Sequence, residues 1–349
     1  MFPYKENPMQ HKQQRMIPDW AWAVLAIAVV ALTLALFMTD RPDEPGEALV
    51  YDVSRYEAVA DDDVRYHETA RIALELDNPS GLAVDSEGRL WATGEGALLM
   101  LDETGREQAR HEIDGRPDCV AVAPDGTMYL GMRDHLAVFS DTGEHHTNWE
   151  TLGERAWTTE IVVDENHVFV ADAGNARVYR YTHDGQILNT IGERDPERDS
   201  IGFVVPSHYL DVAFDAMGAL WVSNPGKLGV EKYRADGALL TAWHQPGFAT
   251  HQFPGCCNPI HIAFKSNGTL VTAEKGINRV KTFAADRSFA GVAATSEHLN
   301  AGWNAAEFPA DPAPIRDLAV DTNDRILVLH GPLRAILVFE PIDAGKEKE

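Results

Sequence analysis

A short pattern of apolar runs and turns recurs six times along the 349 residues of this chain. The first runs are GLAVD (81–85), CVAVA (119–123), EIVVD (160–164), DVAFD (211–215), HIAFK (261–265) and DLAVD (317–321). The last residues of these runs are separated by 38, 41, 51, 50 and 56 positions. A period of about 40–50 residues with three or four short strands per unit is typical of propeller blades.

Each unit continues with a turn and a second run. The turns DSEG (85–88), PDG (124–126) and KSNG (265–268) hold residues that accept the backbone angles of tight hairpins. The second runs, such as LWAT, LWVS and ILVL, have the β-branched and aromatic bias of strands. The sequence therefore predicts an all-β, six-bladed propeller over residues 67–341.

The C-terminal residues supply only the three inner strands of the sixth unit. After AILVFEPID (335–343) only AGKEKE remains, the end of a charged tail that we place at 342–349, whereas HETARIALEL (67–76) precedes the first unit as an unassigned strand. We expect this N-terminal strand to complete blade six, because that pairing removes an open sheet edge.

Parts of the chain resemble NHL repeats. The resemblance is carried by VADAGNARVYRY (170–181) and TAEKGINRVKTF (272–283), and by the lead-in segments GFVVP (202–206), HQFPGCCNP (251–259) and AEFPADPAP (306–314). It implies a six-bladed propeller that serves as a binding platform. More distantly the chain resembles SMP-30/gluconolactonase-like propellers, which implies metal-dependent hydrolysis or lyase chemistry as an alternative; fold likeness alone does not decide between them.

An apolar segment near the N-terminus predicts a membrane anchor. Residues 20–38 contain no charged side chain and are long enough, as a helix, to span about 30 Å of hydrocarbon. Basic residues precede the segment and acidic residues follow it, which favours a short cytoplasmic tail at 1–19. We expect a single-pass protein of the plasma (inner) membrane, a polar linker at 39–66, and an extracytoplasmic (periplasmic or extracellular) propeller. A cleaved signal peptide is the alternative.

The charge of the chain excludes one class of partner. A formal net charge of −24 argues against nucleic acid binding, which depends on Lys and Arg neutralising phosphates. The acidity is consistent with a solvated surface or, where carboxylates converge, with attraction of a cation.

Polar residues interrupt the repeat where the first strand of each blade begins. NHL repeats typically have glycine there, as at Gly81, but blades three to six have Glu160, Asp211, His261 and Asp317. Because first strands surround the propeller axis, we expect these side chains to converge and to hold a divalent metal, Ca²⁺ or Zn²⁺. A water-filled channel lined by polar groups is the alternative.

A second polar set follows the second strands at the same end of the blades. It consists of Asp172, Asn224, Glu274 and His330. These residues are candidates for a second ring at the mouth, although Asp172 is also placed to cap the amides of its turn.

The segment Gly255-Cys256-Cys257-Asn258-Pro259-Ile260-His261 places two thiols just ahead of an axial histidine. Together with Cys119 these thiols suggest a soft metal site or a redox pair. A rigid turn with buried thiols is the alternative.

The long loops into blades four, five and six lie at the polar mouth. Their aromatic residues could line a pocket or pack against the blade edges. The residues concerned are Phe203, Trp243, Phe248, Phe253, Trp303 and Phe308. A Ser/His/Asp hydrolase is disfavoured, because Ser207 and His208 lack a G-x-S-x-G turn.

Three functional hypotheses follow. The first is a membrane-anchored module that binds a protein or small-molecule ligand at the mouth of blades three to six. The second is a divalent-metal-dependent hydrolase or lyase that uses Glu160, Asp211, His261 and Asp317. The third is a thiol redox or metal-handling accessory protein that uses Cys256 and Cys257.

Overall fold

The computed structural model describes residues 54–194, 201–303 and 313–342, together with the isolated positions Trp20, Val24 and Ala28. The chain divides into two compact units, Met1–Asp52 and Val53–Glu349, and the fold described here is that of the second. In the described residues no helix is both long and apolar enough to cross a membrane. The predicted anchor at 20–38 lies almost entirely outside those residues.

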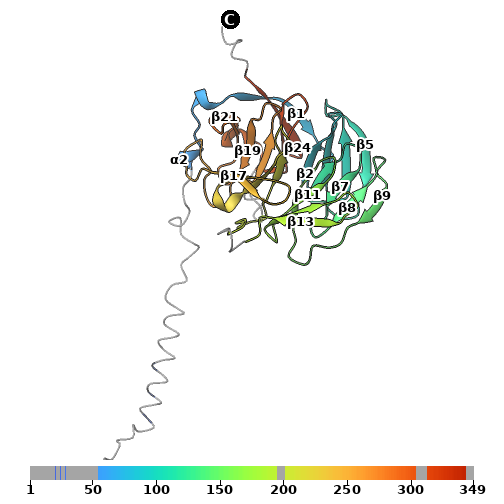
Figure 1. The fold of residues 1–349 in the computed structure, drawn as a ribbon. Helices are drawn as coiled ribbons and strands as arrows, with labels where there is room; N and C mark the ends of the chain where they lie inside the picture. Colours follow the sequence, from blue (N-terminus) through green and yellow to red (C-terminus); the bar gives the residue numbers. More distant parts are fainter. Residues whose placement is uncertain are drawn as a thin grey trace, which may run out of the picture. The chain divides into compact units, whose positions relative to one another are not determined.

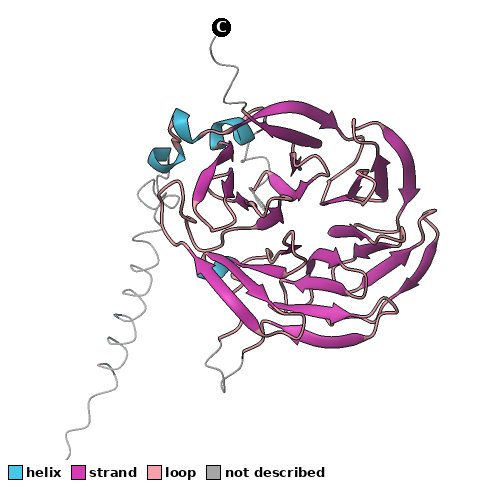
Figure 2. Ribbon diagram, turned by 45° about the horizontal axis from the view of Figure 1, so that its top comes forward, coloured by secondary structure: helices cyan, strands magenta, loops and turns pink. Residues whose placement is uncertain are grey.

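The second unit is a six-bladed propeller, as the repeat predicts. Six four-stranded antiparallel sheets are arranged around one axis (Figures 1 and 2). The strands of blades one to three are β2 (Gly81–Val84), β3 (Leu90–Gly94), β4 (Ala97–Leu101) and β5 (Glu107–Glu112); β6 (Cys119–Val122), β7 (Met128–Gly131), β8 (Leu136–Phe139) and β9 (His145–Asn148); β10 (Thr158–Val163), β11 (Val168–Asp172), β12 (Arg177–Tyr181) and β13 (Ile187–Ile191). Those of blades four to six are β14 (Val212–Phe214), β15 (Leu220–Asn224), β16 (Gly229–Tyr233) and β17 (Leu239–His244); β18 (His261–Phe264), β19 (Leu270–Glu274), β20 (Arg279–Phe283) and β21 (Phe289–Ala294); β22 (Ile315–Val320), β23 (Ile326–His330), β24 (Ala335–Pro341) and β1 (Tyr66–Ala73).

The N-terminal strand closes the ring. β1 pairs antiparallel with β24, so the sheet order of blade six is β1-β24-β23-β22. The predicted closure of blade six by the segment 67–76 is therefore confirmed. The innermost strands contact one another in the order β2, β6, β10, β14, β18, β22 and back to β2. Their first residues consequently meet at one end of a common axis.

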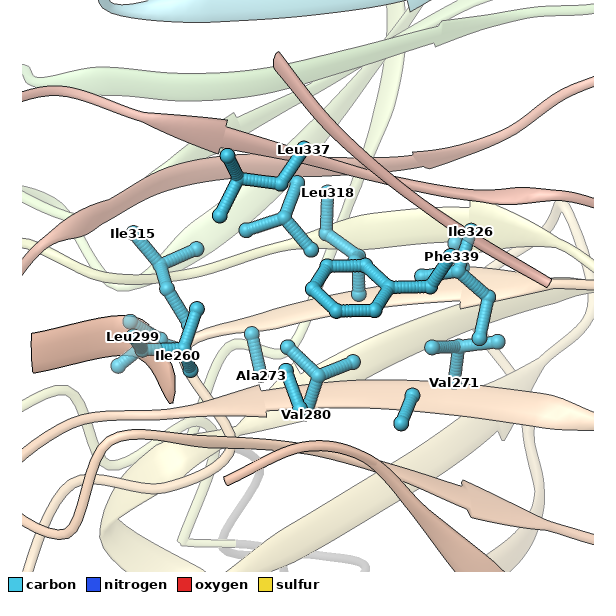
Figure 3. Packing of buried hydrophobic residues seen from close by; sticks show 14 of the residues in the cluster. Ile260, Val271, Ala273, Val280, Leu299, Ile315, Leu318, Ile326, Leu337 and Phe339 are labelled. Carbon is cyan, nitrogen blue, oxygen red and sulfur yellow. The ribbon is translucent and has the colours of Figure 1, made fainter. Parts of the chain in front are cut away.

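Burial explains why the second strands are apolar on both faces. Every residue of β3, β11, β15, β19 and β23 is buried, since each of these strands lies between two neighbouring blades. Outer strands such as β9 are exposed and polar. Between blades five and six, Val271, Leu318 and Phe339 belong to one such layer (Figure 3). This packing fixes the angle between adjacent blades.

The predicted turn residues act through their side chains as well as their backbones. Asp85 Oδ1 accepts hydrogen bonds from the amides of Glu87 and Arg89, and its Oδ2 accepts one from Trp91 Nε1. Asp215 repeats this arrangement in blade four, where it bonds to Trp221 Nε1 at 2.9 Å. Gly88 and Gly218 have positive φ values of 79° and 75°, the region that these hairpin turns require.

Part of the segment expected to be a linker is ordered against blade five. It contains α2 (Ser54–Glu57) and η2 (Asp61–Asp63), and the Arg65 amide donates to the carbonyl of Val292 at 3.0 Å. The Tyr56 ring stacks on Phe248 at 4.6 Å. Two further short elements, η4 (Pro225–Lys227) and α3 (Ser296–Asn300), follow β15 and β21. The chain therefore joins the propeller before β1 begins.

Candidate metal centre and mouth cavity

The four predicted axial residues converge where the innermost strands begin. Glu160 is in β10, His261 starts β18, Asp317 is in β22, and Asp211 directly precedes β14. All four side chains are buried, with residue exposures between 2% and 9%. The replacement of the axial glycine in these blades thus fills one end of the channel with ionisable groups.

The closest contacts join Asp211, His261 and Asp317. His261 Nδ1 lies 2.9 Å from Asp211 Oδ2 and 3.8 Å from Asp317 Oδ1. These three residues each offer a ligand atom, and the three atoms lie within 4.8 Å of one another. Among the described residues, this is the group of three or more His, Cys, Asp or Glu side chains that could hold a metal ion.

Backbone amides of the inner strands point at these carboxylates. Asp317 Oδ2 accepts the Leu82 amide of blade one at 2.6 Å, and Oδ1 accepts its neighbour Leu318 at 2.6 Å. Glu160 Oε1 accepts the amide of Ile161 at 2.9 Å. The innermost strand of a blade has one edge without a strand partner, so its amides need other acceptors. Asp317 therefore also ties blade six to blade one.

Burial raises the pKa of all three carboxyl groups, and repulsion from neighbouring carboxylates adds to this for Glu160 and Asp317. Burial is the main cause for Glu160, whose pKa is raised further by Asp317 and Asp211. Burial also raises the pKa of Asp211, although the amides of Ile262 and Val212 oppose this. The pKa of Asp317 rises to about 7, mainly through burial, with His261 lowering it and Asp211 raising it. Buried carboxylates this close together require a proton or a cation.

The ligand atoms of Asp211, His261 and Asp317 fit a small cation that binds nitrogen as well as oxygen. Asp211 Oδ1 is buried without a hydrogen-bond partner, which leaves it available as a ligand atom. One imidazole and two carboxylates match the ligands that Zn²⁺ prefers, whereas Ca²⁺ requires six to eight oxygens. Of the two predicted ions, the three side chains therefore suit Zn²⁺ better. Glu160 interacts electrostatically with the group but does not belong to it.

The residues predicted as a second ring serve as local structural partners. Asp172 Oδ1 accepts the amides of Trp157 at 2.8 Å and Asn175 at 3.0 Å, the capping role that its turn predicts. Asn224 Oδ1 accepts the amide of Val204 at 3.0 Å, which fixes the loop into blade four.

The other two members of that set are likewise bound within the fold. Glu274 forms ion pairs with Arg279 at 3.2 Å and Lys281 at 2.5 Å, and all three side chains are fully buried. His330 Nε2 lies 2.8 Å from the carbonyl of Leu299. None of the four residues joins the described metal-ligand group.

The three cysteines are all free thiols. Cys119 is buried in the blade-two layer, where burial and nearby Glu160 raise the pKa of its thiol. Cys256 Sγ and Cys257 Sγ lie 3.1 Å apart on the loop into blade five. No cysteine belongs to the metal-ligand group found among the described residues, so the predicted soft site of these thiols with His261 is not assembled.

A cavity of about 440 Å³ opens above His261 at the mouth of the channel. It is lined by Ser80, Arg116, Asp118, Trp157, Thr159, Ser207, His208, Tyr209, Leu210, Ile260, His261, Lys275, Ile315 and Arg316. A second cavity of about 320 Å³ is lined by residues further along the same strands, including Glu160 and Val212. The ionisable group therefore separates two halves of the channel.

The pattern of axial residues did not predict the wall of the mouth cavity. The loop aromatics considered above do not line it in the described residues; Phe203 and Phe253 are instead buried between blades. Two of the lining cations could have been found from position alone. Arg316 directly precedes axial Asp317, and Lys275 directly follows Glu274 at the end of β19.

Comparison with known proteins supports the fold. No family model and no curated protein matches the sequence. The solved structure of a streptogramin B lyase is similar, with a TM-score of 0.54 and 12% identity over 80% of this chain and 98% of that chain. Virginiamycin B lyase from Staphylococcus aureus is similar in selenomethionine-substituted form, with a TM-score of 0.53 and 12% identity over 79% of this chain and 88% of that chain.

A third similar structure contains a ligand. It is a catalytically inactive histidine-to-alanine variant of the S. aureus virginiamycin B lyase with quinupristin, with a TM-score of 0.52 and 13% identity over 81% of this chain and 90% of that chain. At these identities the likeness concerns the fold. The chain is a six-bladed propeller that resembles these lyases, and its membership of the NHL family stays a prediction.

Proposed function

We propose that this propeller is a divalent-metal-dependent lyase or hydrolase that acts on a small carbonyl compound bound in the mouth cavity. The observation that carries the proposal is the buried group of Asp211, His261 and Asp317 directly beneath that cavity. A module that only binds a ligand would not require two buried carboxyl groups of raised pKa against a histidine at the floor of its site.

The metal ligands in this proposal are Asp211, His261 and Asp317. When bound, a cation would supply Lewis-acid polarisation of a substrate carbonyl oxygen. His261 lines the cavity, whereas Asp211 and Asp317 are 2% and 3% exposed, so the protein holds the ligand carboxylates away from bulk water. Their amide partners fix the orientation of these carboxylates before any substrate arrives.

His208 is the cavity residue best suited to move a proton. Its ring stacks on Trp157 at 3.8 Å and lines the cavity together with His261. As a base, its imidazole could take a proton from water in hydrolysis or from carbon in elimination. Trp157 is in turn covered by Arg133 at 4.1 Å, which restrains the stack.

The similar lyases support this choice among the three hypotheses. A histidine variant of virginiamycin B lyase is catalytically inactive, which supports a catalytic rather than a purely structural use of this fold. The binding-module and thiol-redox hypotheses remain, but neither accounts for the convergence of Asp211, His261 and Asp317.

The proposal is tested by assaying the full-length chain with quinupristin and with a gluconolactone, before and after treatment with a chelator. We expect turnover of at least one compound, loss of turnover on chelation, and recovery with Zn²⁺. Product analysis in ¹⁸O-labelled water distinguishes the reactions, since hydrolysis incorporates the label and elimination does not.

Two variants separate the roles of the histidines. His261→Asn should lose both bound metal and activity by at least a hundredfold, whereas His208→Asn should lose activity and retain metal. His146→Asn changes an exposed histidine of β9 and should alter neither. Full activity in the chelated protein, or in His261→Asn, would contradict the metal-dependent reaction.

A further inference from the structure

We propose that the mouth cavity binds a small oxyanion, a carboxylate or a phosphate, through Arg116, Lys275 and Arg316. The inference deepens the proposed function by naming the substrate class, and rests on that function only for the reaction that follows binding. Two independent features of the described residues support it: the sign of the charge in the cavity wall, and the way in which the cations are held.

The charge of the cavity wall is opposite to that of the protein. The chain has 54 acidic and 30 basic residues, so a wall with the average composition would be negative. Apart from its histidines, however, the wall has the basic residues Arg116, Lys275 and Arg316 and one acidic residue, Asp118. Burial raises the pKa of Asp118, whereas the nearby Arg116 and Arg133 lower it. A cationic cleft in an acidic protein concentrates anions locally.

Lys275 is held in place by a buried asparagine. Asn258 is 2% exposed; its Oδ1 accepts the Lys275 amide at 2.9 Å and its Nδ2 donates to the Lys275 carbonyl at 3.1 Å. The ammonium group then donates to Ser207 Oγ at 3.0 Å and lies 4.5 Å from the centre of the Tyr209 ring. Within the described residues no carboxylate lies within ion-pair distance of Lys275. The ammonium group of Lys275 is therefore already held in position before a ligand binds.

A β-bulge directs Arg316 into the cavity. In β22 the pairing with β23 skips from Ile315↔His330 to Asp317↔Leu329, which leaves Arg316 as the extra residue. The bulge lets Asp317 point to the axis while Arg316 lines the cavity, because an extra residue changes the face that a side chain occupies. Blade three has the same irregularity at Thr159, which also lines the cavity.

Arg116 completes the cationic set from the connection between blades one and two. It is exposed at the cavity rim, and within the described residues it forms no ion pair. The three cations thus come from three separate parts of the ring, and the histidine floor lies below them. An anionic group held at the rim would direct the rest of a small molecule toward His261.

Equilibrium binding to the full-length chain tests the inference. Inorganic phosphate and succinate are each titrated calorimetrically with and without a chelator, so that the two titrations distinguish a phosphate site from a carboxylate site. We expect at least one of them to bind, with at least tenfold weaker binding in Lys275→Gln and in Arg116→Gln, since each loses a charge-assisted contact. Arg106→Gln, the same change at an exposed arginine outside the cavity, should bind like the wild type.

The possible outcomes separate this inference from the proposed function. Binding that persists under chelation and weakens in both variants supports the cationic rim even if no reaction is found. Binding that disappears on chelation places the anion on the metal and overturns the inference while favouring the metal centre. Absence of binding for both anions, or equal affinity in Lys275→Gln and Arg116→Gln, also overturns it. Arg116 is exposed, so its variant is expected to fold.

Discussion

At the scale of single residues, the most informative positions are those where one blade departs from the others. Glycine is expected at the start of the first strand, and Glu160, Asp211, His261 and Asp317 replace it in four consecutive blades. Their convergence follows from rotational symmetry, so the sequence alone predicts it. Side-chain packing decides that Asp211, His261 and Asp317 form the close group and that Glu160 lies outside it. The aligned sequence positions alone cannot predict this.

Asp215, at the end of the same run that begins with axial Asp211, has a structural role in its turn. Burial opposes ionisation of Asp215, but hydrogen bonds from Lys232 and Trp221 lower its pKa to about 2. Because the folded-state pKa lies below the unfolded value of 3.8, the ionised group stabilises the fold above about pH 4 and this contribution is lost as the pH falls through about 2.

Asp215→Asn should therefore lower the free energy of unfolding by about 1–3 kcal/mol at pH 7. The difference from the wild type should shrink between about pH 4 and pH 2, because both chains then lack the charge. Urea denaturation across this pH range checks the expectation, with Asp141→Asn as an exposed aspartate control. An Asp215 effect that is constant with pH would contradict the assigned role of the charge.

At the scale of elements, strands and turns were more predictable than loops. Apolar runs bounded by Asp and Gly turns identify the inner strands, because the same run and the same kind of turn recur from blade to blade. The mouth loops differ in length and sequence, and their residues Phe203 and Phe253 pack between blades instead of lining the cavity. The bulge at Arg316 has no signal in the sequence, since it arises from how β22 fits the neighbouring strands.

The segment that follows β1 also takes part in closing the ring. Leu74 follows β1, is 5% exposed, and belongs to the layer between blades six and one. Its amide donates to the Arg334 carbonyl at 2.7 Å, so the N-terminal segment is attached to the turn that precedes β24. The two ends of the propeller consequently depend on each other.

Leu74→Ala should lower the free energy of unfolding by about 2–5 kcal/mol, because it removes a large side chain from a filled layer. Glu75→Ala, at the exposed neighbouring position, should change it by less than about 0.5 kcal/mol. Chemical denaturation followed by tryptophan fluorescence compares the two. Equal effects would show that closure by this segment does not contribute to stability.

At the scale of the whole molecule, the ring explains why residues up to 157 positions apart, Glu160 and Asp317, meet at one end of the channel. The cationic mouth is also a property of the whole, since Arg116, Lys275 and Arg316 come from different parts of the ring. The membrane anchor at 20–38 stays a prediction that the described residues do not test. The likeness to the lyases likewise concerns the arrangement of blades, and the chemistry must be established at the site.

The central claim is that Asp211, His261 and Asp317 form one metal centre, and the most direct test is the metal content of the purified full-length chain. Mass spectrometric element analysis after incubation with Zn²⁺ and removal of excess ion should find about one zinc per chain in the wild type and in Asp141→Asn. It should find at least tenfold less in Asp317→Asn and His261→Asn. A folded wild type that retains no metal, or variants that retain as much as the wild type, would contradict the account.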